Sequence, residues 1–271
     1  IKHHVGTPEQ FYHGRLYLET DFNISLNKNI GINVATHHSV VDSFDSLDRG
    51  PGSKLPNVRT RIRDYLQGAD NYFAKFQIDY KSQLALDHFY RISAGIFEDM
   101  YAGIGVEYLY KPFFKNYALG FESHHLKQRD FNMMFDFRNY EVLTSHINYY
   151  YSEPRTGILA HLSFGKYLAR DKGYTLDLSR RFKNGFKLGA FFSRTNVPAE
   201  IFGEGSFDKG VYFQIPLDNF FNFSTTGAID FKLRPLTRDG GQKVVDASNL
   251  YGFLGNHSSS RLLNEFLNYE L

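Results

Sequence analysis

The 271-residue sequence contains no cysteine and no tryptophan. Without cysteine the chain has no disulfide, thiolate metal site or cysteine nucleophile. Its formal net charge is +2, and no strongly basic run is present, which argues against nucleic acid as a partner. No stretch approaches the ~18 consecutive apolar residues of a membrane-spanning helix, so any membrane crossing has to be made by strands.

The most informative pattern is strict alternation over about ten residues, the length of a tilted membrane-spanning strand. Between residues 16 and 26, every second residue is apolar or small: Leu16, Leu18, Thr20, Phe22, Ile24 and Leu26. The residues between them are Tyr17, Glu19, Asp21, Asn23 and Ser25. A helix cannot present this pattern as one apolar face, because its side chains repeat every 3.6 residues.

The same pattern returns about a dozen times, which predicts an all-β protein: an antiparallel transmembrane β-barrel of about twelve strands with a polar lumen. We expect residues 1–13 to form a lead, 14–235 the barrel and 236–271 a C-terminal tail. A turn-rich loop at 39–70 interrupts the series, and Val58 to Leu66 suggests a short amphipathic helix within it. The chain begins at Ile1 without the residue order of a signal peptide, which predicts a mature or trimmed product.

Alternation alone does not show whether the apolar face of the sheet points outward to lipid or inward to a hydrophobic core. Two features favour a membrane barrel over a soluble one: about twelve strands enclose more volume than apolar side chains readily fill, and tyrosines near strand ends are typical of interfacial girdles. The aromatic content of 17%, combined with a mean hydropathy of −0.40, fits apolar residues that all face one way. The residues predicted to face lipid include Leu176, Leu178, Leu188, Ile229 and Phe231.

In a membrane barrel the polar face of the strands lines the lumen. Its charged groups can form a cross-strand lattice, and together with tyrosines they can bind sugar hydroxyls and stack on pyranose faces. The candidate lumen or glycan-contact residues are Tyr17, Glu107, Glu122, Tyr150, Tyr167, Asp177, Arg181, Lys187, Tyr212, Asp230 and Lys232.

Motifs for chemistry are weak. His146 and Ser163 lie on the polar faces of neighbouring predicted strands, but no ordered Ser/His/acid signature accompanies them. The adjacent pairs His3-His4, His37-His38 and His124-His125 send their side chains to opposite faces of a strand, which disfavours a shared metal. FGEGSFDKG, from Phe202, lacks the context of a phosphate-binding loop. We therefore expect no catalytic residue, metal or cofactor.

The predicted connections are short at one end of the barrel and long at the other, at 39–70, 128–139 and 196–207. Both chain termini are expected at the long-loop end, and since barrel termini usually remain in the periplasm, the long loops are predicted to face it. Charged loop residues there are candidates for docking secretion partners: Arg59, Arg61, Arg129, Glu204, Asp208, Lys209, Arg238 and Asp239.

Several stretches carry a resemblance to a known family. The run from Gly157 to Phe220, together with RPLTRDGG from Arg234, MYAGIGVEYLYKPF from Met100, KQRDF from Lys127 and LPNVRTRI from Leu55, resembles the C-terminal region of the YjbH proteins, including the group 4 capsule relative GfcD. The resemblance covers about residues 55 to 245. It implies an outer-membrane β-barrel, encoded beside exopolysaccharide or capsule genes, of which this chain is the C-terminal portion, and it supplies no catalytic residues.

Together these observations predict a non-enzymatic component of exopolysaccharide or capsule secretion in the bacterial outer membrane. It would conduct or guide the polysaccharide, or dock periplasmic partners. The expected partners are the polysaccharide, outer-membrane lipid and periplasmic or lipoprotein components of the secretion machinery. The alternatives are a barrel enzyme acting on lipid or glycan, and a structural scaffold with a blocked lumen.

Overall fold

The computed structural model describes residues 2–5, 12–44, 54–202, 207–217, 220, 228–234, 239–246 and 248–255. These residues form one antiparallel sheet in which each strand pairs with its neighbours in sequence. The strands are β1 (Lys2–Val5), β2 (Tyr12–Ser25), β3 (Ile30–Asp42), β4 (Asn71–Ala85), β5 (His88–Ile96), β6 (Tyr101–Tyr110), β7 (Tyr117–Arg129), β8 (Phe137–Glu153), β9 (Ile158–Lys166), β10 (Lys172–Arg181), β11 (Lys187–Thr195), β12 (Asp208–Pro216) and β13 (Ala228–Leu233).

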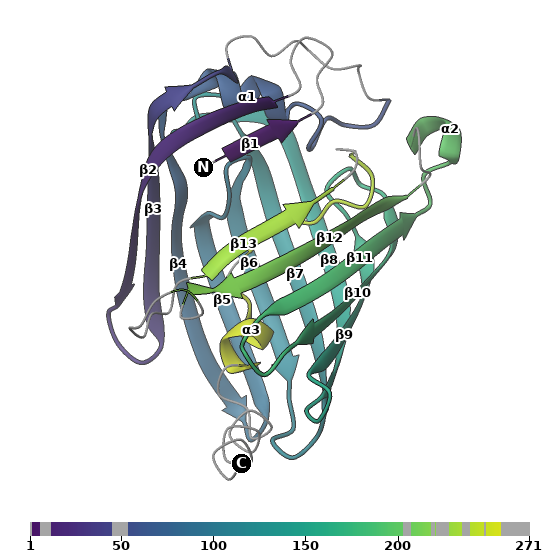
Figure 1. Ribbon diagram of the computed structural model, residues 1–271. Helices are drawn as coiled ribbons and strands as arrows, with labels where there is room; N and C mark the ends of the chain where they lie inside the picture. The colour runs from purple at the N-terminus through teal and green to yellow at the C-terminus, as the bar shows by residue number, and fades with distance from the viewer. Residues whose placement is uncertain are drawn as a thin grey trace.

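The sheet curves around an interior, as an up-and-down barrel does (Figure 1). The sequence predicts about twelve strands, and the described residues form thirteen. The additional one is β1, within the stretch predicted to be a lead, which pairs with the first residues of β2. Among the described residues, β1 and β13 are the two edges and do not pair with each other. The all-β antiparallel class is confirmed.

The outer face of the sheet is apolar, and the inner face is polar. On β10, Leu178 is 48% exposed, whereas the next residue, Ser179, is 5% exposed. Leu188, Ile229 and Phe231 are exposed as predicted, and Leu176 is half-buried. The buried polar side chains of the strands include Gln77, Asp79, Arg91, Ser93, Glu107, His124, Thr144, His146, Asn148, Ser163, Ser179 and Ser193. The predicted register is therefore confirmed, since a one-residue slip would invert every one of these positions.

Tight turns connect the strands at one end of the sheet. The turn between β10 and β11 contains Gly185 with φ +81°, a left-handed conformation that favours glycine. In this turn the N–H of Phe186 donates to the side-chain oxygen of Asn184. The Asn184-Gly185 hairpin predicted from the sequence is thus present.

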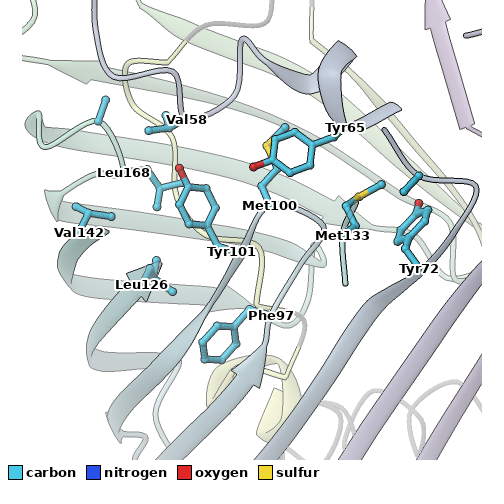
Figure 2. Close-up of a cluster of buried hydrophobic side chains, with 12 residues drawn as sticks. Val58, Tyr65, Tyr72, Phe97, Met100, Tyr101, Leu126, Met133, Val142 and Leu168 are labelled. Carbon is cyan, nitrogen blue, oxygen red and sulfur yellow. The ribbon is translucent and has the colours of Figure 1, made fainter. Parts of the chain in front are cut away.

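The main hydrophobic core lies at the opposite end, among the long loops (Figure 2). It joins the loop before α1 (Ile62–Gly68) to strand ends and to the turn at 97–100. Its buried members are Val58, Tyr65, Ala69, Tyr72, Phe97, Met100, Tyr101, Leu126, Met133, Val142, Leu168 and Ala169. Helix α1 begins four residues later than the predicted span, and two further short helices are α2 (Ala199–Phe202) and α3 (Leu250–Gly255). No helix in the described part of the chain has the length and apolar content needed to span a bilayer.

The chain after β13 does not stay at the long-loop end. Residues 239–246 and 248–255, which we call the lumen segment, run from that end along the inner face of the sheet. The segment ends in α3, which packs mainly on β5 and β6 and lies toward the tight-turn end (Figure 1). The expectation that both ends of the chain share the long-loop end is therefore wrong for the described C-terminal residues. They return through the interior because their polar groups find partners there.

Candidate functional site: a polar lumen crossed by the C-terminal segment

The lumen segment begins with a carboxylate fixed to the loop before α1. Oδ1 of Asp239 accepts hydrogen bonds from the backbone N–H groups of Val58, Arg59 and Thr60 at 2.9, 2.7 and 2.9 Å. Oδ2 accepts one from the Thr60 hydroxyl at 2.8 Å. Four charge-assisted bonds to a side chain that is 2% exposed hold the start of the segment firmly.

Four stretches that carry the family resemblance meet at this point. Asp239 belongs to RPLTRDGG and binds LPNVRTRI, and Gln128 of KQRDF donates to the carbonyl of Asn57 at 3.0 Å. The Arg59 guanidinium lies over the ring of Tyr101, 5.5 Å from its centroid, which places MYAGIGVEYLYKPF in the same cluster. These motif residues therefore join the loops into one body at the long-loop end.

Arg129 joins the segments of this body through hydrogen bonds to their backbone carbonyls. It is 0% exposed, and Nη1 donates to the carbonyls of Phe73, Glu98 and Asp99 at 2.9 to 3.1 Å. Nη2 donates to the carbonyls of Met133 and Met134. The two terminal nitrogens of the planar guanidinium thus bind five backbone carbonyls.

Tyr65 on α1 adds a further bond to the same residue, because its hydroxyl donates to the carbonyl of Arg129 at 2.6 Å. Burial raises the pKa of this hydroxyl well above its ordinary value, so it remains a proton donor.

A second carboxylate holds the start of the lumen segment. In the β9–β10 loop, Asp171 accepts a hydrogen bond from the backbone N–H of Gly241 at 2.7 Å, and burial raises the pKa of the Asp171 carboxyl.

Halfway along the lumen, Lys243 anchors the segment to the wall. Its ammonium lies 2.5 Å from Oε1 of Glu122 on β7 and donates to the hydroxyl of Ser163 on β9 at 3.2 Å. His146 on β8 approaches the same carboxylate oxygen with Nδ1 at 3.5 Å. The segment thus supplies the cation that balances a carboxylate of the inner face.

This cluster bears on the enzyme alternative. Ser163 is 1% exposed, and the hydrogen bond described for its hydroxyl comes from Lys243. Among the residues that the structure describes, Nε2 of His146 has no hydrogen-bond partner, so no hydrogen bond between these two side chains marks them as base and nucleophile. The arrangement is that of an ion pair between wall and segment.

A second charged cluster lies further along the segment. Arg91 on β5 donates from Nε to Glu107 on β6 at 3.0 Å and pairs through Nη1 with Asp79 on β4 at 3.2 Å. Both of its terminal nitrogens also bind Asp246 of the lumen segment. Nε2 of His124 lies 3.5 Å from the same carboxylate. All these groups are buried, and such a cluster is stable only because every charge faces an opposite one.

The segment ends on an aromatic stack. Tyr251 lies on Tyr150 of β8 with ring centroids 3.8 Å apart and an interplanar angle of 5°. The ring of His161 on β9 also stacks on Tyr150, at 4.3 Å and 13°. Beside the stack, the N–H of Leu250 donates to both carboxylate oxygens of Glu107 at 3.0 Å.

The predicted lumen residues therefore divide into groups. Glu107, Glu122 and Tyr150 face the lumen segment. Tyr167 is fully buried, with its hydroxyl 2.7 Å from that of Thr175. Tyr17 lies apart, against His37 at 4.3 Å between centroids.

A separate group lies on β10 to β13. The hydroxyl of Tyr212 donates to Asp177 at 2.6 Å, and the Lys187 ammonium is 5.4 Å from the centroid of the same ring. Asp230 accepts from Gln214, Lys232 lies over Phe191, and Arg181 is exposed. This half of the inner face lies away from the strands on which α3 packs.

The predicted docking residues are placed differently from one another. Arg129, Asp208 and Asp239 are at most 3% exposed, so their side chains are not available at the surface. Arg59 is enclosed by Glu98 at 2.7 Å and by the carbonyl of Lys243 at 2.8 Å. Of the remaining candidates, Arg61 is half-buried and pairs with Asp64, Lys209 is exposed, and Glu204 and Arg238 lie outside the described residues.

Sequence reasoning missed the two ends of the principal ion pair. Arg91 lies on the inward face of a predicted strand, and the period of two was a signal that could have marked it as a lumen residue. Asp246 carries no such signal, because the stretch predicted as a tail has no periodicity that places it inside a barrel. That Asp246 pairs with Arg91 follows only from the tertiary structure.

Comparison with known proteins agrees with the resemblance. The family model YjbH, described as "Exopolysaccharide biosynthesis protein YbjH", matches residues 1–256. The chain is similar to the Escherichia coli (strain K12) protein named "Uncharacterized lipoprotein YjbH", with 35% identity over 261 residues. That alignment covers 94% of this chain and 37% of the relative, so the chain spans well under half of the relative's length. The chain belongs to the YjbH family of exopolysaccharide biosynthesis proteins.

Proposed function

We propose that this protein is a non-enzymatic outer-membrane β-barrel component of exopolysaccharide or capsule export. The observation that carries the proposal is the inverted polarity of the sheet. Exposed leucine, isoleucine, phenylalanine and tyrosine cover its outer face, while charged and amide side chains are buried on its inner face. A sheet of this kind suits an apolar environment outside and a polar one inside.

Family membership supports the connection to exopolysaccharide, and the relative's name supports an envelope location, since a lipoprotein is attached to a membrane. Within export, the barrel would conduct or guide the polymer, or hold periplasmic partners at its long-loop end. Arg61 and Lys209 are the predicted docking residues whose positions suit contact with a partner.

A second candidate is a scaffold barrel whose lumen stays blocked. The observation that favours it is the lumen segment itself, which crosses the interior and is fixed at Asp239, Lys243, Asp246 and Tyr251. For conduction, the part of the segment beyond Asp239 has to leave the wall. Its contacts at Lys243 and Asp246 are polar, and water and a polymer rich in hydroxyls can replace such contacts.

Deletion of the gene, followed by measurement of surface and periplasmic polysaccharide, tests the export role. We expect less polymer at the surface and restoration by the wild-type gene. Unchanged amount, location and linkage composition would reject the role. A changed chain length or linkage pattern with normal secretion would instead support an enzyme.

Planar-bilayer conductance separates conduction from scaffolding. The wild-type protein is compared with the double variant Asp246→Ala/Tyr251→Ala, which weakens the two inner anchors and leaves Asp239 in place. Conduction predicts a larger or more frequent open state in the variant. A scaffold predicts equally low conductance in both proteins, together with normal export by the variant.

A further inference from the structure

We propose that the lumen-facing side of the Tyr150 ring is a stacking subsite for an uncharged sugar ring of the exported polysaccharide, and that Tyr251 occupies this subsite in the structure. The inference rests on the proposed role in export. It assigns to the lumen segment a defined action, because the segment competes with the polymer for the same aromatic surface.

The Tyr150 ring is held in place before any ligand arrives. His161 stacks on it with centroids 4.3 Å apart, and Nε2 of His161 is 2.9 Å from the side-chain oxygen of Asn148. The neighbouring strands β8 and β9 thus fix both rings, since residues 150 and 161 are direct cross-strand partners. A ring fixed in this way loses little side-chain entropy when a ligand stacks on it.

The ligand side of Tyr150 accepts a flat ring. Tyr251 lies parallel to it at 3.8 Å and 5°, which leaves Tyr150 only 8% exposed. When the segment withdraws, this face becomes open to the lumen. The C–H groups on one face of a pyranose ring carry partial positive charge and pack on the negative face of an aromatic ring.

A hydrogen-bond acceptor stands beside the aromatic surface. Glu107 accepts the N–H of Leu250, the residue before Tyr251, through both carboxylate oxygens. A sugar hydroxyl donates to a carboxylate in the same way. Arg91 fixes this carboxylate from the other side at 3.0 Å, so the acceptor and the ring keep their relative positions.

The charges on the wall select an uncharged sugar. Lys243 and Asp246 leave with the segment, and the wall then retains the carboxylates of Asp79, Glu107 and Glu122 against the guanidinium of Arg91 and the ammonium of Lys81. Three carboxylates outnumber these two cations, and the excess negative charge disfavours uronic acids and other anionic units at this position.

Binding of labelled oligosaccharides to the intact protein in detergent, followed by fluorescence anisotropy, tests the inference. The probes are cellohexaose and maltohexaose as neutral chains, and hexagalacturonate as an anionic chain. Tyr251→Ala is expected to tighten binding of a neutral probe by about tenfold or more, because an internal competitor is removed. Hexagalacturonate is expected to bind weakly to every variant.

Variants at Tyr150 provide the decisive comparison. Tyr150→Leu keeps an apolar side chain but removes the ring, and it is expected to abolish the gain when combined with Tyr251→Ala. Tyr150→Phe is expected to retain binding, since stacking needs the ring and not the hydroxyl. Val245→Ala is the matched control, because it shortens an exposed side chain of the same segment and should leave the affinity unchanged.

The inference is overturned if Tyr251→Ala binds neutral probes no more tightly than wild type, if Tyr150→Leu leaves the gain intact, or if the anionic probe binds best. None of these outcomes affects the export role, which is judged by surface polysaccharide in the deletion strain. If the binding measurements fail in this way while export still depends on the gene, only the stacking subsite is rejected.

Discussion

Asp246 of the lumen segment binds both terminal nitrogens of Arg91 on β5, although the two residues are 155 positions apart in the sequence. Arg91 also holds Asp79 and Glu107. One guanidinium thereby contacts two wall carboxylates and one segment carboxylate. The ion pair therefore links the lumen segment to strand β5 of the barrel wall.

Arg91 contacts three carboxylates, whereas Asp246 is one of those three, and this difference gives the first prediction. Arg91→Ala leaves three buried carboxylates without their cation and should lower the free energy of unfolding by about 3–5 kcal/mol. Asp246→Asn should cost less, because Arg91 keeps Asp79 and Glu107. Urea unfolding in detergent, monitored by circular dichroism, measures both values. The prediction fails if Asp246→Asn is the more damaging change.

The second prediction concerns the lipid-facing surface. Leu178→Arg places a charge on the outer face of β10 and should cost about 2–4 kcal/mol if the position is near the bilayer midplane. Ser179→Arg, one residue away on the inner face, should be milder because a polar lumen accommodates the guanidinium. Folding titrations into lipid vesicles compare the two, and a larger cost at Ser179 would contradict the membrane assignment of the faces.

The third prediction addresses the start of the lumen segment. Asp239→Ala removes the acceptor of four hydrogen bonds from Val58, Arg59 and Thr60. Leaving these buried and partly buried donors unpaired should cost about 1–3 kcal/mol. It should also make the loop before α1 more sensitive to proteolysis.

Limited proteolysis with mass spectrometry locates the new cleavage sites. Asp230→Ala is the control, because Asp230 is an exposed aspartate on β13 and its loss should leave the digestion pattern unchanged. Cleavage that is equal in both variants would show that Asp239 does not secure the loop.

Period-two alternation predicted the strands and their faces because each strand depends on a local pattern. Leu178 and Ser179 illustrate this: the sequence assigned them to opposite faces, and the structure places them there. The extra strand β1 was missed because four residues are too few to show alternation. Its pairing depends on β2, which a local pattern does not encode.

The interior could not be predicted in the same way. Arg129 and Asp239 read as charged loop residues in the sequence, and charge in a loop usually means exposure to solvent. Both are buried because backbone groups far away in the sequence bind them: N–H groups of the loop before α1 bind Asp239, and carbonyls of several segments bind Arg129. Such convergence depends on tertiary contacts, so the sequence reveals the residue types but not their partners.

The last prediction is the orientation of the barrel. We predict that the long loops face the periplasm and the tight turns face the outside, because the long-loop body with Arg61 and Lys209 would then meet the periplasmic partners of the proposed export role. Lys183 in the β10–β11 turn and Lys54 before α1 are both exposed. This chain has no cysteine, so single Lys183→Cys and Lys54→Cys variants introduce one thiol each. In intact cells an impermeant maleimide should label the variant at position 183 and not the variant at position 54, while both should react after the outer membrane is permeabilised. Labelling at position 54 but not at 183 in intact cells would reverse the orientation and place the long-loop body, with Arg61 and Lys209, on the cell surface.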